Sequence, residues 1–301
     1  MFKPVVRAAV ARLLARLNEK GPFVSLLLFD FLFVYVLDLA VAAGIPSLSL
    51  WTQNAANFVC NAMVAQGFQL PTEITGVSLG SVQPPFPSDE FALQSHLDWL
   101  QMHRKHSVLY IAFGTLATIS EMQLEDLVLG LEASEQPFIW VFRGNLCAQT
   151  KDYTFESFSR RLGMQGLLVP WASQRDVLSH PSIGGFLTHC GWNSTIEAIN
   201  AGVPMLTWPV FVDQFLNRRW IVEQWGMGLD FDPSDSTGQL ITRTEVEKKV
   251  RALMQGMAGE QLRGKAKNWS NLAQRAYEEK GSSLKRFHCL KEEIWSLQSN
   301  K

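Results

Sequence analysis

The sequence lacks several features that would assign it to particular classes of protein. It has four cysteines in 301 residues, at Cys60, Cys147, Cys190 and Cys289, and no CxxC pair. Such widely spaced cysteines form neither a disulfide framework nor a zinc site, and they indicate a reducing compartment such as the cytoplasm. The net charge is −1, which argues against a broad electrostatic attraction to nucleic acid.

Long apolar runs and the common phosphate-binding motifs are missing as well. The most apolar stretch, 23–37, is too short for a membrane span and contains Asp30, so we predict a buried strand followed by a helix. Neither GxGxxG nor GxxxxGK[ST] occurs, which argues against a dinucleotide-dependent dehydrogenase and a P-loop enzyme. The Arg-rich opening, 1–17, resembles an organelle transit peptide, but an amphipathic surface helix explains it equally simply.

Short apolar runs alternate with helical patterns along most of the chain. We predict strands at 24–29, 47–51, 107–113, 138–142, 166–169, 185–189 and 205–208. We predict helices at 34–43, 121–134, 194–200, 216–225, 244–254, 260–279 and 283–297. The segment 67–90 is rich in Gly, Pro and Ser and is predicted to be a loop or linker. The alternation predicts an α/β fold with parallel sheets, which bind ligands at the carboxyl ends of their strands.

The loop after the predicted strand 185–189 combines the features of an anion site. Gly191 allows close approach of the backbone, and His189, Asn193 and Ser194 offer side-chain donors ahead of a helix N-terminus. A diphosphate suits such a place. The alternative is that Ser194 and Glu197 form a capping box, which needs no ligand.

Other predicted strand ends carry further candidates, each with a structural alternative. Trp171 could stack on a planar base or pack in the core. The pair Asp213 and Gln214 suits sugar hydroxyls, or Asp213 caps the next helix. Asp30 ends an apolar run, so it is either functional or a cap for the following helix.

The order and spacing of these residues resemble a known family. From Trp171 to Gln214 the chain reads WASQRDVLSHPSIGGFLTHCGWNSTIEAINAGVPMLTWPVFVDQ. This resembles the 44-residue signature box of the plant family 1 UDP-dependent glycosyltransferases, without insertion or gap. The segments 24–52 and 96–114 and the Gly-Ser-Ser at 281–283 are similar to other parts of that family. The resemblance implies a GT-B fold, with two Rossmann-like domains and the active site between them.

The resemblance also implies a donor site for UDP-glucose or a related UDP-sugar, in which the box holds the nucleoside. Trp171 would stack on the uracil, and the backbone of Ala172 would read its edge. Gln174 would lie near the ribose, and Glu197 would accept from both ribose hydroxyls.

The phosphates and the sugar would be held by further positions of the same box and by one residue outside it. The implied phosphate ligands are Thr115, His189, Asn193 and Ser194. The implied sugar contacts are Trp192, Asp213 and Gln214, with Gln214 typical of members that use glucose. No cofactor and no metal is expected.

The acceptor side resembles the family less completely. We expect domains at 1–92, an incomplete N-terminal acceptor domain with linker, at 93–280, the donor domain, and at 281–301, a helix that packs back towards the N-terminal domain. The family's general-base His precedes the point where this chain begins to match, whereas Asp30 matches the Asp that orients it. Two hypotheses follow. The chain transfers a hexose with inversion to a hydroxyl of a small lipophilic acceptor, as in plant secondary metabolism, or it is an inactive UDP-sugar-binding remnant.

Overall fold

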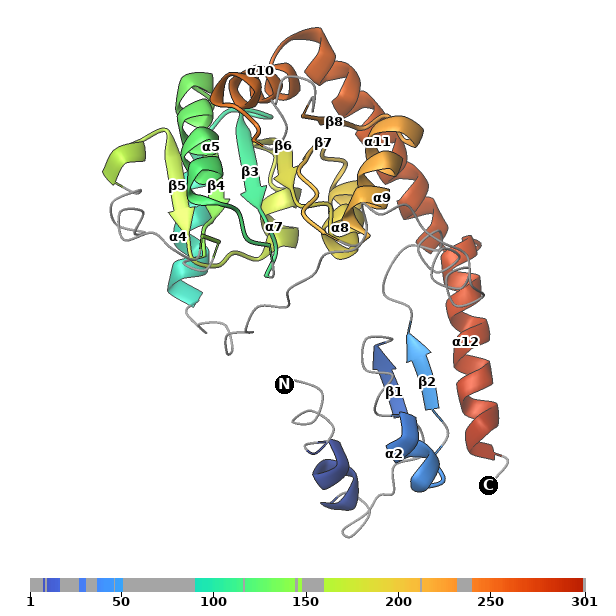
Figure 1. Cartoon of the computed structure of the whole chain (residues 1–301). Helices are drawn as coiled ribbons and strands as arrows, with labels where there is room; N and C mark the ends of the chain where they lie inside the picture. The colour runs from blue at the N-terminus through green and yellow to red at the C-terminus, as the bar shows by residue number, and fades with distance from the viewer. Residues whose placement is uncertain are drawn as a thin grey trace, which may run out of the picture. The chain divides into compact units, whose positions relative to one another are not determined.

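The computed structural model of the chain describes the residues 8, 10–16, 27–30, 37–45, 47–50, 90–115, 117–143, 146–147, 160–211, 213–231 and 240–299 (Figure 1). The chain divides into two compact units. The smaller unit comprises 1–62 together with 275–301, and the larger comprises 63–274. The predicted linker at 67–89 lies outside the described residues.

The larger unit is built on a six-stranded sheet whose strand pairs are all parallel, in the order β5-β4-β3-β6-β7-β8. The strands are β3 (Val108–Ala112), β4 (Phe138–Val141), β5 (Gly166–Val169), β6 (Ile183–Thr188), β7 (Met205–Thr207) and β8 (Gly228–Asp230). The predicted α/β class with a parallel sheet is therefore confirmed. The edge strand β8 was not predicted, because its three residues give too short an apolar run.

Helices cover both faces of this sheet (Figure 1). They are α4 (Glu90–Gln101), α5 (Glu121–Ser134), α7 (Gln174–Ser179), α8 (Trp192–Ala201), α9 (Gln214–Arg219), α10 (Arg243–Met254) and α11 (Gly256–Tyr277). Apolar residues of α5 and α10 share one core cluster, and those of α4, α7 and α8 share another. The carboxyl ends of the strands are left to the connecting loops.

The alternation of side chains along β3 explains why two separate cores form. Leu109 and Ile111 are fully buried against α5 and α10, whereas Val108 and Tyr110 are buried on the opposite face. A strand with both faces buried reads as a continuous apolar run, which is the pattern that predicted it.

The segment predicted as one helix at 216–225 consists of two kinds of helix. It starts as the α-helix α9 and continues as the π-helix η3 (Trp220–Gln224). The backbone N–H of Trp225 donates to the carbonyl of Trp220 at 2.8 Å, a spacing of five residues. The prediction of a single α-helix was therefore wrong in its second half.

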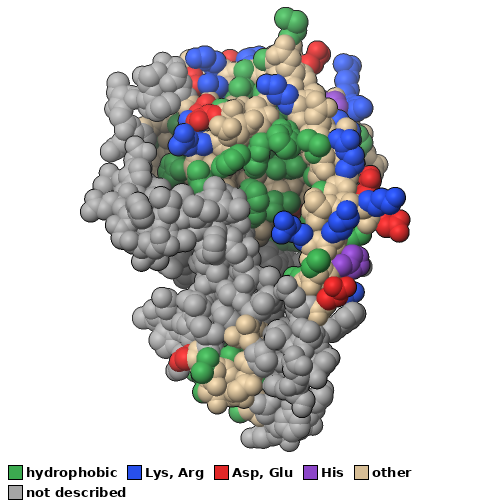
Figure 2. Space-filling model, turned by 90° about the vertical axis from the view of Figure 1, so that its right-hand side faces the viewer, with side chains coloured by type: hydrophobic (Ala, Val, Ile, Leu, Met, Phe, Trp, Pro, Cys, Tyr) green, Lys and Arg blue, Asp and Glu red, His purple; other side chains and the backbone are tan. Residues whose placement is uncertain are grey.

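The long helix α11 packs through one narrow stripe. Its buried residues are Gly259, Leu262, Ala266 and Ser270, spaced three or four apart. The side of the molecule that carries this helix shows many Lys and Arg side chains in Figure 2. This division into buried and charged faces accounts for the helical pattern that predicted it.

The smaller unit contains a parallel pair of strands, β1 (Leu27–Asp30) and β2 (Ser47–Leu50). Its helices are α2 (Leu37–Ala42), α12 (Ser282–Ser299) and a short helical segment at 10–16. Within the described ranges, no helix has the length and hydropathy that crossing a membrane would require.

Candidate functional site

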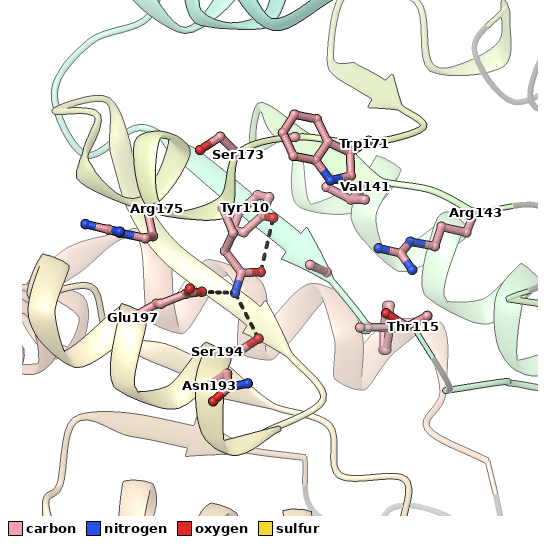
Figure 3. Close-up of a pocket in the computed structure, with 15 residues that line it drawn as sticks. Tyr110, Thr115, Val141, Arg143, Trp171, Ser173, Arg175, Asn193, Ser194 and Glu197 are labelled. Atoms are coloured by element: carbon pink, nitrogen blue, oxygen red, sulfur yellow. Dashed lines mark hydrogen bonds between the residues drawn. The ribbon is translucent and has the colours of Figure 1, made fainter. Parts of the chain in front are cut away.

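A pocket of about 500 Å³ opens at the carboxyl edge of the six-stranded sheet (Figure 3). Its walls come from the ends of β3, β4 and β5, the loops that follow them, and the first turns of α7 and α8. The lining residues are Tyr110, Ala112, Phe113, Gly114, Thr115, Val141, Arg143, Trp171, Ala172, Ser173, Gln174, Arg175, Asn193, Ser194 and Glu197. The volume lies within the range of small-molecule sites, which is roughly 300–1,000 Å³.

Gln174 connects three elements at one side of this pocket. Its Nε2 donates to Ser194 Oγ at 2.9 Å and to Glu197 Oε2 at 2.5 Å, both on α8 (Figure 3). Its Oε1 accepts from the hydroxyl of Tyr110, on β3, at 3.3 Å. The amide thus fixes the carboxylate of Glu197 in the empty pocket, which is the preorganisation that ligand recognition needs.

Tyr110 forms the buried floor below this network. Its ring stacks on Phe186 with centroids 4.9 Å apart. Burial raises the pKa of the Tyr110 hydroxyl, and the nearby charge of Glu197 raises it further. The hydroxyl therefore stays protonated and serves as a hydrogen-bond donor to Gln174.

The capping-box interpretation of Ser194 and Glu197 was wrong. Helix α8 begins at Trp192, with Gly191 as its N-cap, so Ser194 and Glu197 lie inside the helix. Both side chains receive hydrogen bonds from Gln174 instead of capping the backbone. The N–H groups of the first turn have no partner within the helix, and a turn that faces a pocket with free N–H groups favours an anion.

Trp171 lies at the rim of the pocket and not in the core. Its side chain is half-buried and lines the pocket, on the opposite side from Asn193 and Ser194 in Figure 3. The core-packing alternative for Trp171 was therefore wrong. An indole ring in this position offers a flat apolar face to a ligand.

His189 is buried behind the pocket wall, between two glycines. A Cβ atom added at Gly114 or at Gly191 would lie 2.5 Å from His189 Nε2, so the ring fits only against glycine at both positions. Burial is the main cause that lowers the pKa of His189, to about 4, so the ring is neutral at pH 7. Its Nδ1 is buried without a hydrogen-bond partner among the described residues.

The three predicted sugar contacts lie outside the pocket lining. The carboxylate of Asp213 accepts from Asn217, and Gln214 Oε1 accepts from the backbone N–H groups of Val210 and Phe211. The ring of Trp192 lies 6.5 Å from that of Trp225. Asp213 does occupy the N-cap of α9, but its side chain makes no capping hydrogen bond.

Seven of the predicted donor-site residues are brought together in the pocket: Thr115, Trp171, Ala172, Gln174, Asn193, Ser194 and Glu197. Asp30 ends β1 in the smaller unit, and its side chain lies outside the described residues. In the described part of the chain, no group of three His, Cys, Asp or Glu residues could hold a metal ion.

The sequence interpretation missed Tyr110 and Arg143. Tyr110 lies within an apolar run, and nothing in the run distinguishes a pocket floor from ordinary core. Arg143, by contrast, follows the predicted strand 138–142 directly. The rule that ligands bind after parallel strands would have identified it, had the loop after that strand been included among the rim loops.

Comparison with known proteins points to one family. The family model described as UDP-glucoronosyl and UDP-glucosyl transferase matches residues 88–261. UDP-glycosyltransferase 85A1 of Arabidopsis thaliana is 42% identical over 192 residues, which cover 64% of this chain and 38% of that protein. UDP-glycosyltransferase 73C4 of Solanum lycopersicum is 42% identical over 208 residues, covering 65% of this chain and 60% of that protein. The match thus spans less than two thirds of the length of these relatives.

Solved structures of the same kind share the fold. Os79 from O. sativa in complex with UDP superimposes with a TM-score of 0.82 and 25% identity, covering 97% of this chain and 83% of that chain. Phytolacca americana UGT2, complexed with UDP-2fluoro-glucose and pterostilbene, gives a TM-score of 0.75 and 25% identity, covering 97% of this chain and 80% of that chain. The predicted GT-B fold is thereby confirmed.

Proposed function

This chain belongs to the UDP-glucoronosyl and UDP-glucosyl transferase family, and from that premise we propose that it transfers a hexose from a UDP-sugar to a small acceptor. The donor is proposed to be UDP-glucose. The acceptor is a hydroxyl of a small lipophilic molecule of the kind that plant secondary metabolism supplies, and the anomeric centre is inverted. The single observation that carries the proposal is the pocket in which Gln174 holds Glu197 opposite Trp171.

The nucleoside is proposed to lie between these side chains. Trp171 stacks on the uracil, and the backbone of Ala172 reads the edge of the base. Glu197 accepts hydrogen bonds from the ribose hydroxyls. The bond from Gln174 occupies its Oε2, which leaves Oε1 for the ribose and supports this assignment.

The phosphates are proposed to lie at the N-terminus of α8. Asn193 and Ser194 start that helix, and Thr115 lines the pocket from the loop after β3. His189 is proposed to bind a phosphate oxygen through its ring. Its buried Nδ1, which has no partner among the described residues, supports a role in binding a polar ligand.

The sugar is proposed to be held by Trp192, Asp213 and Gln214. Burial raises the pKa of the Asp213 carboxyl, and the hydrogen bond from Asn217 opposes that rise. The bonded carboxylate suits the hydroxyls of a hexose. The preference for glucose rests on Gln214.

The remaining assignments follow the family resemblance. We propose that 93–280 forms the donor domain, that 1–92 belongs to the acceptor domain, and that the helix 281–301 packs back onto it. Asp30 is proposed to orient a general base. The expectations of a metal-free reaction and of a cytoplasmic location stay predictions.

A second candidate function is binding of a UDP-sugar without transfer. One observation favours it. The titratable residues that line the pocket are Tyr110, Arg143, Arg175 and Glu197. The hydroxyl of Tyr110 and the carboxylate of Glu197 are both bonded to Gln174, so neither is placed as a general base for an acceptor.

Two assays on the purified chain test these proposals together. In the first, UDP-glucose is titrated against ADP-glucose, and a pocket that reads uracil binds the UDP-sugar at least about tenfold more tightly. In the second, a panel of phenolic and terpenoid alcohols is incubated with UDP-glucose, and the acceptor mass is followed for the gain of one hexose. Binding with transfer supports the first function, and binding without transfer supports the second. Equal binding of both donors, or none, would contradict both.

A further inference from the structure

Arg143 is a cationic group in the pocket to which no function is assigned above. It lies two residues beyond the end of β4 and is half-buried in the pocket lining. Its backbone is held from both sides, since the N–H of Phe142 donates to Val169 at 2.9 Å and its own carbonyl accepts from Leu146 at 3.0 Å. The side chain therefore projects from a fixed position on the rim.

The guanidinium of Arg143 forms no ion pair with any carboxylate that the structure describes. The acidic residue of the pocket lining, Glu197, is bonded to Gln174 and lies across the pocket from Arg143 in Figure 3. The other lining arginine, Arg175, is exposed. The pocket thus contains a positive charge that no neighbouring carboxylate neutralises.

The charge of Arg143 is felt by the groups that form the pocket. It lowers the pKa of the Tyr110 hydroxyl, against the larger effect of burial. It also contributes to lowering the pKa of His189, after burial. Both groups are buried next to the proposed nucleotide, so the guanidinium lies within electrostatic reach of that ligand.

The strand order fixes which part of a nucleotide Arg143 would meet. β4 lies between β5 and β3, so Arg143 sits on the rim between Trp171, which follows β5, and Thr115, which follows β3. Trp171 is assigned to the base and Thr115 to the phosphates. Arg143 consequently faces the part of the ligand where the nucleoside joins the diphosphate.

We propose that Arg143 binds the diphosphate of the donor nucleotide and is a further determinant of donor affinity. This inference rests on the proposed function. A guanidinium presents two parallel N–H donors that match two phosphate oxygens, and a charge-assisted pair of this kind is stronger than a neutral hydrogen bond. The diphosphate would then be held between the α8 N-terminus on one side and Arg143 on the other.

The test compares ligands that differ only in the phosphates. Uridine and UDP are titrated calorimetrically into the wild type, Arg143→Gln, Arg143→Lys and the matched control Arg175→Gln. Arg143→Gln is expected to weaken UDP binding by about 10- to 100-fold and to leave uridine within a factor of about two. Arg143→Lys keeps the charge but loses the fork, so its loss should be intermediate. Arg175→Gln should bind both ligands as the wild type does.

The salt dependence gives a second readout that a merely structural role would not move. UDP affinity of the wild type should fall more steeply with added NaCl than that of Arg143→Gln. If UDP and uridine weaken equally in Arg143→Gln, or if neither changes while the wild type binds UDP, the inference is overturned and the proposed function survives. If the folded wild type binds no UDP, the proposed function fails and takes this inference with it.

Discussion

The side-chain amide of Asn217 donates a hydrogen bond to the carboxylate of Asp213, with Nδ2 and Oδ2 2.8 Å apart. The same nitrogen donates to the backbone carbonyl of Cys190 at 2.9 Å. Cys190 is buried in the left-handed conformation, with φ of 64°, in the turn that leads into α8. Asn217, itself fully buried, therefore joins the loop that starts the proposed phosphate site to the acid proposed to bind the sugar.

Replacing Asn217 by alanine should destabilise the protein. The change removes the donor to the Cys190 carbonyl and to the Asp213 carboxylate, and an unsatisfied buried polar group costs about 1–3 kcal/mol. We expect the free energy of unfolding, measured by urea titration, to fall by about that amount. Asn200→Ala, at an exposed position of α8, is the control and should change it by less than about 0.5 kcal/mol. Equal losses in the two variants would show that Asn217 does not tie the loops together.

Gly114→Ala should cost more than an alanine at another glycine of similar conformation. Gly114 has φ of 69°, and its new Cβ would lie 2.5 Å from His189 Nε2. Gly163 has φ of 54° and open space around it, so Gly163→Ala carries only the left-handed strain of about 1–2 kcal/mol. We expect Gly114→Ala to lose a further 1–3 kcal/mol or so of unfolding free energy, from the clash. Similar losses for both would mean that the ring of His189 moves aside easily.

His189 should make the stability depend on pH. Its pKa falls from 6.5 to about 4 on folding, so the unfolded chain binds the proton more tightly. The contribution of the neutral ring to stability is fully present above pH 6.5 and is lost as the pH falls from 6.5 to 4. The shift corresponds to about 3 kcal/mol at most. Urea unfolding of the wild type and His189→Gln at pH 7.5 and pH 4.5 should show a smaller acid loss in the variant, whereas parallel losses would rule out this role.

The sequence predicted the sheet better than it predicted the details of the site. Strands such as β3 and β6 are buried on both faces, so their apolar runs identified them directly. The rule that ligands bind at the carboxyl ends of parallel strands then pointed to Trp171, Thr115 and the start of α8. These residues do line one pocket.

The errors of prediction arose where tertiary contacts decide the outcome. Ser194 and Glu197 have the spacing of a capping box, but Gly191 ends the preceding turn and starts the helix before them. The π-helix at 220–224 has the same residue types as an α-helix, because periodicity cannot distinguish a single wider turn. Helix α4 was not predicted, since it follows directly on a Pro-rich segment that reads as a linker.

The measurement that tests the central claim most directly is a calorimetric titration of the purified chain with UDP-glucose, beside Glu197→Ala. The carboxylate of Glu197 is held by Gln174 and proposed to bind the ribose, so its loss should weaken UDP-glucose about 10- to 100-fold. Glu260→Ala, at an exposed position of α11, is the matched control and should bind as the wild type does. Saturable binding that Glu197→Ala loses and Glu260→Ala keeps is the result predicted. No binding by the folded wild type, or equal binding by all three proteins, would contradict a UDP-sugar site in this pocket.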